Sequence, residues 1–146
     1  MSEFPQEEML SAADRIEIHE LTTAYGMHHD LRNFDSLRRC FMTDATYIMK
    51  VADGPTFGPH VGIDAVVDQI RTFKNAQSDK RRHHISNIQV HPRDANTATV
   101  LSYVIVSAVA NQELRFVTVG TYTDTVIRTH EGWRISAKEL NLDIGF

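Results

Sequence analysis

Two clusters of side chains in this sequence are able to carry out acid–base chemistry. Tyr25, His29 and Asp30 lie close together early in the chain, and His83 and His84 stand side by side much further along. Imidazole is the side chain that takes up and releases a proton near neutral pH. A carboxylate beside it orients the ring and stabilises its charged form, so residues of the two clusters could together form a general base.

The first cluster falls at the end of a predicted helix. Ser11 and Asp14 have the spacing of a capping box, which predicts that a helix begins after Ser11 and ends near Asp30. Apolar residues recur at spacings of three and four and place Tyr25 on the buried face. A carboxylate near a helix C-terminus is disfavoured by the helix dipole, by roughly 0.3–1 kcal/mol. Asp30 therefore needs either solvent or a charged partner such as a protonated imidazole.

The second cluster opens a predicted strand. Side chains alternate along a strand, so His83, Ile85 and Asn87 share one face, while His84 and Ser86 share the other. A histidine in a strand is either a hydrogen-bonded structural residue or a general base held by a carboxylate, and the pattern leaves both interpretations open. The histidines lack the spacing of a metal site, so we expect no metal. The sequence has no Gly-rich phosphate loop and no dinucleotide fingerprint, so it does not support a kinase or a redox enzyme.

Further side chains could complete a pocket. Lys138 is a strand cation that could reach it, although cations on strands are more often solvated. Either His28 or His29 could border the pocket from the helix. The residues that we expect to bind a substrate are Tyr47, Met49, Asn87, Tyr103, Arg115 and Phe116. A mostly apolar lining with a few polar groups is typical of sites for small molecules.

The composition limits the class of protein. The chain has 146 residues with 15 Lys+Arg and 19 Asp+Glu, for a formal net charge of −4. This length suits one domain, and the acidic balance disfavours nucleic acid or an anionic membrane as a partner. No apolar stretch of the sequence is long enough to span a membrane. The single cysteine excludes an intrachain disulfide and fits a reducing compartment, so we expect a cytoplasmic protein.

Helices are predicted in the first half of the chain and mostly strands in the second. Residues 1–10 are expected to form a flexible arm, and residues 11–146 a single domain. Helices are predicted at 11–30, at 34–41 and after Gly62, with a strand at 45–50 and a loop at 51–61. Four long strands are predicted at 81–91, 97–109, 113–128 and 133–142. Short turns between these strands imply antiparallel neighbours, and the order of elements indicates an α+β fold whose helices cover one face of a sheet.

The sequence resembles a known family over nearly its whole length. Residues 14–45 are similar to the opening of SnoaL-like proteins, which belong to the nuclear-transport-factor-2-like superfamily. Residues 83–87 are similar to their histidine strand, and residues 120–135 to their closing hairpin. The resemblance implies a cone-shaped, curved antiparallel sheet wrapped around three N-terminal helices, the cystatin-like α+β barrel. It also implies an apolar pocket and assembly into a homodimer or homotrimer.

Within this superfamily the chain is most similar to the branch that holds scytalone dehydratase, bile-acid 7α-dehydratase and hexachlorocyclohexane dehydrochlorinase. Those enzymes use an Asp–His dyad and no cofactor, and the resemblance selects Asp30 and His83 as its members here. It also assigns Tyr25 as a hydrogen-bond donor to the substrate and Lys138 as an electrostatic aid. The second histidine of scytalone dehydratase has no counterpart in the matching strand, at residues 107–110.

The resemblance implies a cofactor-independent lyase that performs a dehydratase-type elimination, or an isomerase, on a hydrophobic cyclic or aromatic small molecule. The alternative is a non-catalytic protein: a small-molecule-binding module, or an assembly subunit that resembles the small subunit of ring-hydroxylating dioxygenases. Epoxide hydrolysis on this fold would need an Asp–Arg–Asp arrangement, but Arg115 and Asp124 are expected on opposite faces of their strand. An Asp30 carboxylate within hydrogen-bond reach of His83, beside a cavity, would favour the enzyme.

Overall fold

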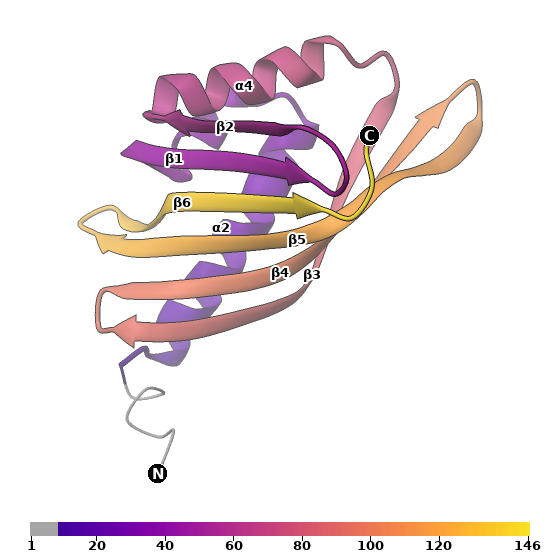
Figure 1. Cartoon of the computed structure of the whole chain (residues 1–146). Helices are drawn as coiled ribbons and strands as arrows, with labels where there is room; N and C mark the ends of the chain where they lie inside the picture. Colours follow the sequence, from indigo (N-terminus) through magenta and orange to yellow (C-terminus); the bar gives the residue numbers. More distant parts are fainter. Residues whose placement is uncertain (1–8) are drawn as a thin grey trace.

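The computed structural model describes residues 9–146, which form three helices and six strands (Figure 1). The helices are α2 (Ala12–Asp30), α3 (Phe34–Arg38) and α4 (Ile63–Asn75). The strands are β1 (Phe41–Val51), β2 (Thr56–Val61), β3 (Lys80–Asp94), β4 (Thr97–Ala110), β5 (Glu113–Thr129) and β6 (Gly132–Leu142). The predicted α+β arrangement, with helices early and long strands late, is confirmed.

The six strands form one curved sheet with the order β2-β1-β6-β5-β4-β3. Four neighbouring pairs are antiparallel, whereas β1 and β6 are parallel. The three antiparallel pairs among β3, β4, β5 and β6 are those that the short turns predict. The parallel pair joins the first strand to the last, and no local turn signals such a distant contact in the sequence. Among the described residues the edge strands β2 and β3 do not pair with each other, so the sheet is open rather than a closed barrel.

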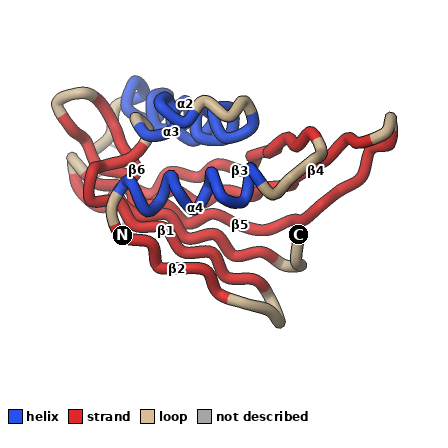
Figure 2. Tube along the Cα trace, turned by 90° about the horizontal axis from the view of Figure 1, so that it is seen from above, coloured by secondary structure: helices blue, strands red, loops and turns tan. Residues whose placement is uncertain are grey.

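The helices pack on the sheet and close the core. Figure 1 shows α2 crossing behind the sheet and α4 lying along β2, and Figure 2 shows α2 and α3 on one side of the strands. The largest buried side chains of this core include Ile18, Leu37, Val66, Val104, Tyr122, Trp133 and Ile135. Within residues 9–146 we find no helix with the length and apolar character that a membrane crossing requires.

Helix α2 is tied to the sheet at its first turn. The predicted capping box is present, since the backbone N–H of Asp14 donates to Ser11 Oγ and that of Ser11 donates to Asp14 Oδ2, both at 3.0 Å. The Asp14 carboxylate also accepts two hydrogen bonds from Arg128, at 2.7 and 2.9 Å, and one from Trp133 Nε1 at 3.2 Å. The guanidinium of Arg128 holds the pKa of Asp14 well below its ordinary value. The junction of β5 and β6 therefore fixes where α2 begins.

Two predicted boundaries are wrong. The expected loop over 51–61 contains strand β2, which pairs with β1. Pro59 is tolerated in β2 because this strand is the edge of the sheet, where a missing N–H costs no ladder hydrogen bond. The second helix ends at Arg38 rather than Phe41, because Phe41 already pairs with Ile135 of β6.

The flexible arm predicted over residues 1–10 falls mostly on residues 1–8, which lie outside the described residues. Leu10 corrects the prediction at its other end. Its side chain is 3% exposed and belongs to the hydrophobic core, so the packed domain begins before the helix cap.

A buried ion pair lies within the sheet. Lys138 Nζ donates to Asp124 Oδ2 at 2.8 Å, and neither side chain reaches solvent. The Lys138 ammonium also sits 4.1 Å from the ring centre of Tyr25 and 4.0 Å from that of Tyr122, which is a cation–π arrangement. Burial lowers the pKa of Lys138 and raises that of Asp124, and the attraction between the charges opposes both shifts. The rings of Tyr25 and Tyr122 are therefore held in place by their contacts with the Lys138 ammonium.

Replacing Lys138 with Met is expected to lower the free energy of unfolding by about 3–5 kcal/mol, because Asp124 would then be buried without its partner. The double variant K138M/D124L removes both charges and should recover most of that loss. Urea unfolding followed by circular dichroism measures both effects. A single variant as stable as the native protein would show that the pair does not support the core.

Candidate active site

Asp30 and His83 are joined by two hydrogen-bonding contacts where α2 meets β3. Asp30 Oδ1 lies 2.6 Å from His83 Nδ1, and Asp30 Oδ2 accepts a hydrogen bond from the backbone N–H of His83 at 2.8 Å. Both side chains are largely buried, with 6% of Asp30 and 10% of His83 exposed. Because Nδ1 faces the carboxylate, Nε2 is the ring nitrogen that is free to act on a ligand.

Local packing explains why these two side chains meet. Asp30 is the last residue of α2, so its carboxylate can reach beyond the helix end to β3. Gly26 lies one turn earlier, and a Cβ at that position would stand 2.9 Å from Ile85 Cδ1 and 3.6 Å from His83 Cβ. The missing side chain allows α2 to approach β3 closely enough for the pair to form.

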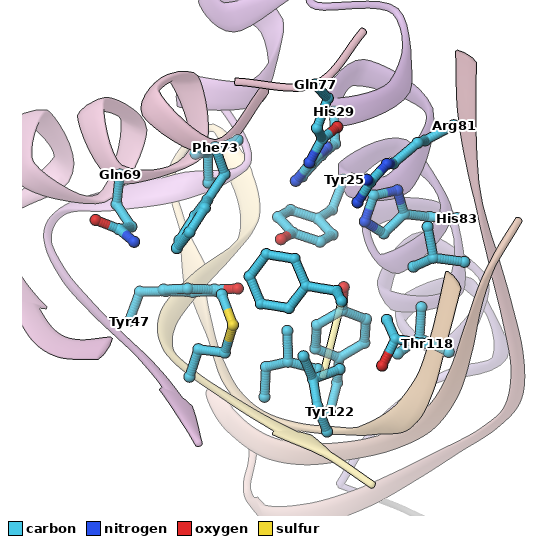
Figure 3. Close-up of a pocket in the computed structure, with 17 residues that line it drawn as sticks. Tyr25, His29, Tyr47, Gln69, Phe73, Gln77, Arg81, His83, Thr118 and Tyr122 are labelled. Carbon is cyan, nitrogen blue, oxygen red and sulfur yellow. The ribbon is translucent and has the colours of Figure 1, made fainter. Parts of the chain in front are cut away.

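His83 faces a pocket between the helices and the sheet (Figure 3). Polar side chains of His29, Gln77, Arg81 and His83 gather on one side of this pocket. The apolar and aromatic lining residues are Tyr25, Tyr47, Met49, Ile70, Phe73, Val104, Val106, Tyr122, Leu140, Leu142 and Phe146. The structure thus places the expected residues Tyr25, Tyr47 and Met49 in the same pocket as His83.

Two tyrosine hydroxyls point into the pocket, those of Tyr25 and Tyr47 (Figure 3). The Tyr25 side chain is fully buried, and its Oη has no hydrogen-bond partner among the described residues. Burial raises the pKa of both tyrosines above the ordinary value, so both hydroxyls keep their protons and can donate. Leaving a buried hydroxyl unpaired costs free energy, which an oxygen atom of a ligand would recover.

His29 lies between Tyr25 and His83 in the pocket. Its ring centre is 4.2 Å from that of His83 and 5.8 Å from that of Tyr25. Burial, followed by the proximity of His83 and Lys74, lowers the pKa of His29 well below its ordinary value. The Nδ1 atom of His29 has no partner among residues 9–146. His29 is therefore a neutral imidazole that can give or accept one hydrogen bond at the polar side of the pocket.

His29, Asp30 and His83 each offer one atom suited to a metal ion, and these atoms lie within 4.8 Å of one another. Asp30 Oδ1 and His83 Nδ1 are instead bonded to each other at 2.6 Å. A metal ion bound by these two atoms would have to replace that bond. The expectation of a metal-free site stays a prediction, with a test given under the proposed function.

Lys138 lies outside the pocket. Its ammonium sits behind the rings of Tyr25 and Tyr122 and is paired with Asp124, so the expectation that it reaches a substrate is wrong. Regular alternation would put Lys138 opposite the buried Trp133 and Ile135, but an irregularity in β6 brings it to the same side, beneath the two tyrosine rings. Lys138 can influence the pocket only by holding the two tyrosines in place.

Asn87 and Tyr103 line a second hollow, on the outer face of the sheet, and not the pocket of His83. Regular alternation would put Asn87 on the inner face. Strand β3 has a bulge between Ser86 and Gln89, where Asn87 takes a φ of 55°. A bulge adds a residue to one strand and reverses the faces beyond it, which explains the error.

Arg115 and Phe116 also lie away from the pocket. The Arg115 side chain is 57% exposed and bonds to Asp79, and Phe116 is 75% exposed. Both belong to the β4–β5 hairpin, which projects beyond the helices (Figure 1). His84 faces outward as predicted, with its Nε2 2.8 Å from Ser107 Oγ.

Sequence reasoning missed Arg81 and Gln77 as lining residues and left open which neighbouring histidine lines the pocket. The sequence pattern could have placed two of these residues, Arg81 and His29, in the pocket. Arg81 precedes His83 by two residues and therefore shares its strand face. His29 follows Tyr25 by four residues and therefore shares its helical face. Gln77 lies in the connection between α4 and β3, where no periodicity applies.

Phe146 narrows the pocket. Its ring packs edge-on against Phe73, with centres 5.2 Å apart, and Thr118 Oγ1 donates to the nearby Ile144 carbonyl at 2.6 Å. The pocket is partly open to solvent, and its volume is about 60 Å³. An apolar cavity that holds benzene measures roughly 150 Å³, so an aromatic ring would fit fully inside only if a ring of the lining moved.

Replacing Phe146 with Ala should speed the entry of an aromatic ligand, because it removes the ring that narrows the pocket. Stopped-flow fluorescence with 2-naphthol measures the association rate. Ile144→Ala is the matched control, since that side chain is 59% exposed and does not line the pocket. Equal rates for the native protein and F146A would contradict the assigned role of the ring.

The buried His29 predicts a loss of stability in acid. Its folded-state pKa is lowered, so below about pH 6.5 the unfolded chain binds a proton there that the folded chain does not. The free energy of unfolding is therefore not reduced by His29 above that pH. It falls as the pH drops below it, by at most about 1.4 kcal/mol per pH unit for this one group. His29→Gln should lose less stability than the native protein when urea unfolding is compared at neutral and acidic pH. Identical losses would show that His29 is charged in the folded protein.

The chain is similar in sequence and in structure to several known proteins. A curated relative, the anthranilate 1,2-dioxygenase small subunit of Burkholderia cepacia, is 29% identical over 137 residues, which cover 87% of this chain and 85% of the relative. The structure of an NTF2-like protein with a cystatin-like fold from Novosphingobium aromaticivorans is 26% identical, with a TM-score of 0.75 over 89% of this chain and 82% of that one. ActVI-ORFA from Streptomyces coelicolor has a TM-score of 0.75 at 16% identity, over 88% of this chain and 97% of that one.

These likenesses confirm the cystatin-like, NTF2-like fold expected from the sequence. The family model of the SnoaL-like domain matches residues 11–139, which is most of the chain and includes Asp30 and His83. The protein belongs to the SnoaL-like domain family.

Proposed function

We propose that this protein is a cofactor-independent lyase or isomerase in which His83 is the general base and Asp30 holds it. The observation that carries the proposal is the 2.6 Å contact between Asp30 Oδ1 and His83 Nδ1 beside a largely apolar pocket. The backbone N–H of His83 anchors the second carboxylate oxygen at 2.8 Å, so the carboxylate is oriented before any ligand binds. A pre-oriented His–Asp pair at a cavity is suited to removing a proton from a ligand.

In an elimination, His83 Nε2 would take a proton from a ligand carbon next to a carbonyl group. The electrons of the C–H bond form a carbon–carbon double bond, and the hydroxyl on the neighbouring carbon leaves with the electrons of its own bond. The imidazolium returns its proton to that hydroxyl, which departs as water. Asp30 stabilises the imidazolium between the two proton transfers. In an isomerisation the same proton returns to a different carbon.

Tyr25 and His29 would stabilise the negative charge that develops on the carbonyl oxygen. Each has an unpartnered polar atom among the described residues, and each is neutral because burial disfavours its charged form. Donors that are fixed in advance in a dry site stabilise an oxyanion better than mobile water does. The apolar walls then favour a hydrophobic cyclic or aromatic substrate.

The second candidate function is a non-catalytic subunit. The observation that favours it is the 29% identity to the dioxygenase small subunit over most of both chains. In that case the Asp30–His83 pair would serve to tie α2 to β3. Proton-transfer activity therefore separates the two functions.

Self-association as a homodimer or homotrimer is part of the proposal. The outer face of β4 and β5 exposes a group of apolar side chains, namely Leu101, Tyr103, Ile105, Leu114, Phe116 and Val119. Where exposed apolar side chains gather on one face of a sheet, a contact with another protein is a common explanation. It lies on the side of the sheet away from the pocket, so assembly would leave the site accessible.

Hydrogen–deuterium exchange at the acidic carbon of 2-tetralone, an apolar bicyclic ketone, tests the base without knowledge of the natural substrate. The native protein should accelerate this exchange in D₂O, as followed by NMR. His83→Ala and Asp30→Asn should lower the accelerated rate by roughly 10²–10⁴-fold, the usual contribution of a positioned base. EDTA should leave the rate unchanged.

His84→Ala is the matched control, because it removes the neighbouring imidazole on the outer face and should keep the full rate. Thermal unfolding of each variant verifies that the fold is intact. Exchange that persists in H83A would rule out His83 as the base, and a loss with EDTA restored by zinc would overturn the metal-free site. No acceleration by the native protein would favour the non-catalytic subunit.

A further inference from the structure

Arg81 occupies the polar side of the pocket beside the proposed base. It lies two residues before His83 on the same face of β3, and both side chains line the pocket. Figure 3 shows its guanidinium on the side of the pocket where His29 and His83 lie. Only 12% of the Arg81 side chain is exposed. A cation of this kind is held inside the protein rather than solvated at its surface.

Asp79 holds Arg81 from one edge. Arg81 Nε donates to Asp79 Oδ1 at 2.7 Å, and Nη2 lies 3.4 Å from Oδ2. The Asp79 carboxylate is itself largely buried, with 10% exposed, and its pKa is lowered chiefly by the hydrogen bond from Arg81. The guanidinium is therefore fixed in orientation before a ligand arrives.

The other edge of the guanidinium is free to bind. Among the described residues, Nη1 of Arg81 has no hydrogen-bond partner, and Nη2 has only the long contact to Asp79. A guanidinium presents its two terminal nitrogens as a planar fork, which matches the two oxygens of a carboxylate. The edge that Asp79 leaves open has this shape.

Arg81 is the permanent cation among the described lining residues. Asp79, which holds it, also accepts a hydrogen bond from Arg115 Nη2 at 3.0 Å, and the Asp30 carboxylate is engaged by His83. Among the described residues that line the pocket, none is an Asp or Glu, and Arg81 is the one that always carries a charge. A permanent cation in a largely apolar cavity is stabilised by an anionic ligand.

We infer that Arg81 recognises a carboxylate on the substrate, so that the ligand class is a cyclic or aromatic carboxylic acid. The apolar walls contact the ring, and the carboxylate pairs with the open edge of Arg81. This inference deepens the proposed function, since it uses the same pocket and rests on His83 acting on the bound ring. Arg81 is then the residue that determines specificity for an acid over its neutral analogues.

Benzoate and benzamide test this inference, because they have nearly the same shape and differ in charge. Isothermal titration should show that the native protein binds benzoate more tightly than benzamide, by about tenfold or more, as expected for a buried charged hydrogen-bonded pair. Arg81→Met should lose that preference and bind the two ligands alike. Arg81→Lys keeps the charge without the fork and should retain part of the preference.

Arg115→Met is the matched control, because it removes the other guanidinium bound to Asp79 but leaves the pocket lining unchanged. It should keep the preference for benzoate. The exchange test uses the neutral ketone 2-tetralone, which has no carboxylate for Arg81, so a failure of the proposed base and a failure of this inference are told apart. Circular dichroism melts verify the fold of each variant.

Three results would overturn the inference. The first is equal binding of benzoate and benzamide by the native protein, and the second is no binding of either at the highest soluble concentration. The third is a preference for benzoate that survives in the folded R81M variant. In each case the cation would serve only to tie β3 to Asp79.

Discussion

The bond between the Asp30 carboxylate and His83 is the constraint on which the rest of the site depends. It joins the last residue of α2 to the inner face of β3 through both oxygens, at 2.6 and 2.8 Å. With the other end of α2 held by Arg128 on the Asp14 carboxylate, the helix is fixed at both ends. Tyr25 and His29 lie on that helix, so their positions in the pocket follow from the same two anchors.

The structure separates polar groups that support the core from polar groups that remain available. Lys138 donates to Asp124 within the core and supports the rings of Tyr25 and Tyr122. Tyr25 Oη and His29 Nδ1 lack hydrogen-bond partners among the described residues, and both side chains line the pocket. Buried polar groups are normally paired, since leaving them unpaired costs free energy, so an unpaired group beside a cavity indicates where a ligand's polar atoms belong.

Much of the fold could be predicted from local signals. The capping box of Ser11 and Asp14 marks the start of α2, and alternation gives the faces of β5 and of the first part of β3. The parallel pairing of β1 with β6 could not be predicted, because it joins residues far apart in the sequence without a turn. The residues of the site were harder to predict from the sequence than the fold. Alternation puts Lys138 on the face opposite Trp133 and Ile135, but an irregularity in β6 after Ile135 turns it inward. The bulge at Asn87 likewise reverses a face that the sequence shows as continuous.

Gly26 has a consequence for the comparison of SnoaL-like sequences with one another. A helix interior disfavours glycine relative to alanine by roughly 1 kcal/mol, so a residue chosen for helix stability alone would not be glycine. Here a methyl group would stand 2.9 Å from Ile85 Cδ1, so the end of the Ile85 side chain would have to move. A larger side chain would also have to fit against His83, whose Cβ is 3.6 Å from the same point. A small residue four positions before the aspartate is therefore a feature to compare among relatives that carry both the aspartate and the histidine.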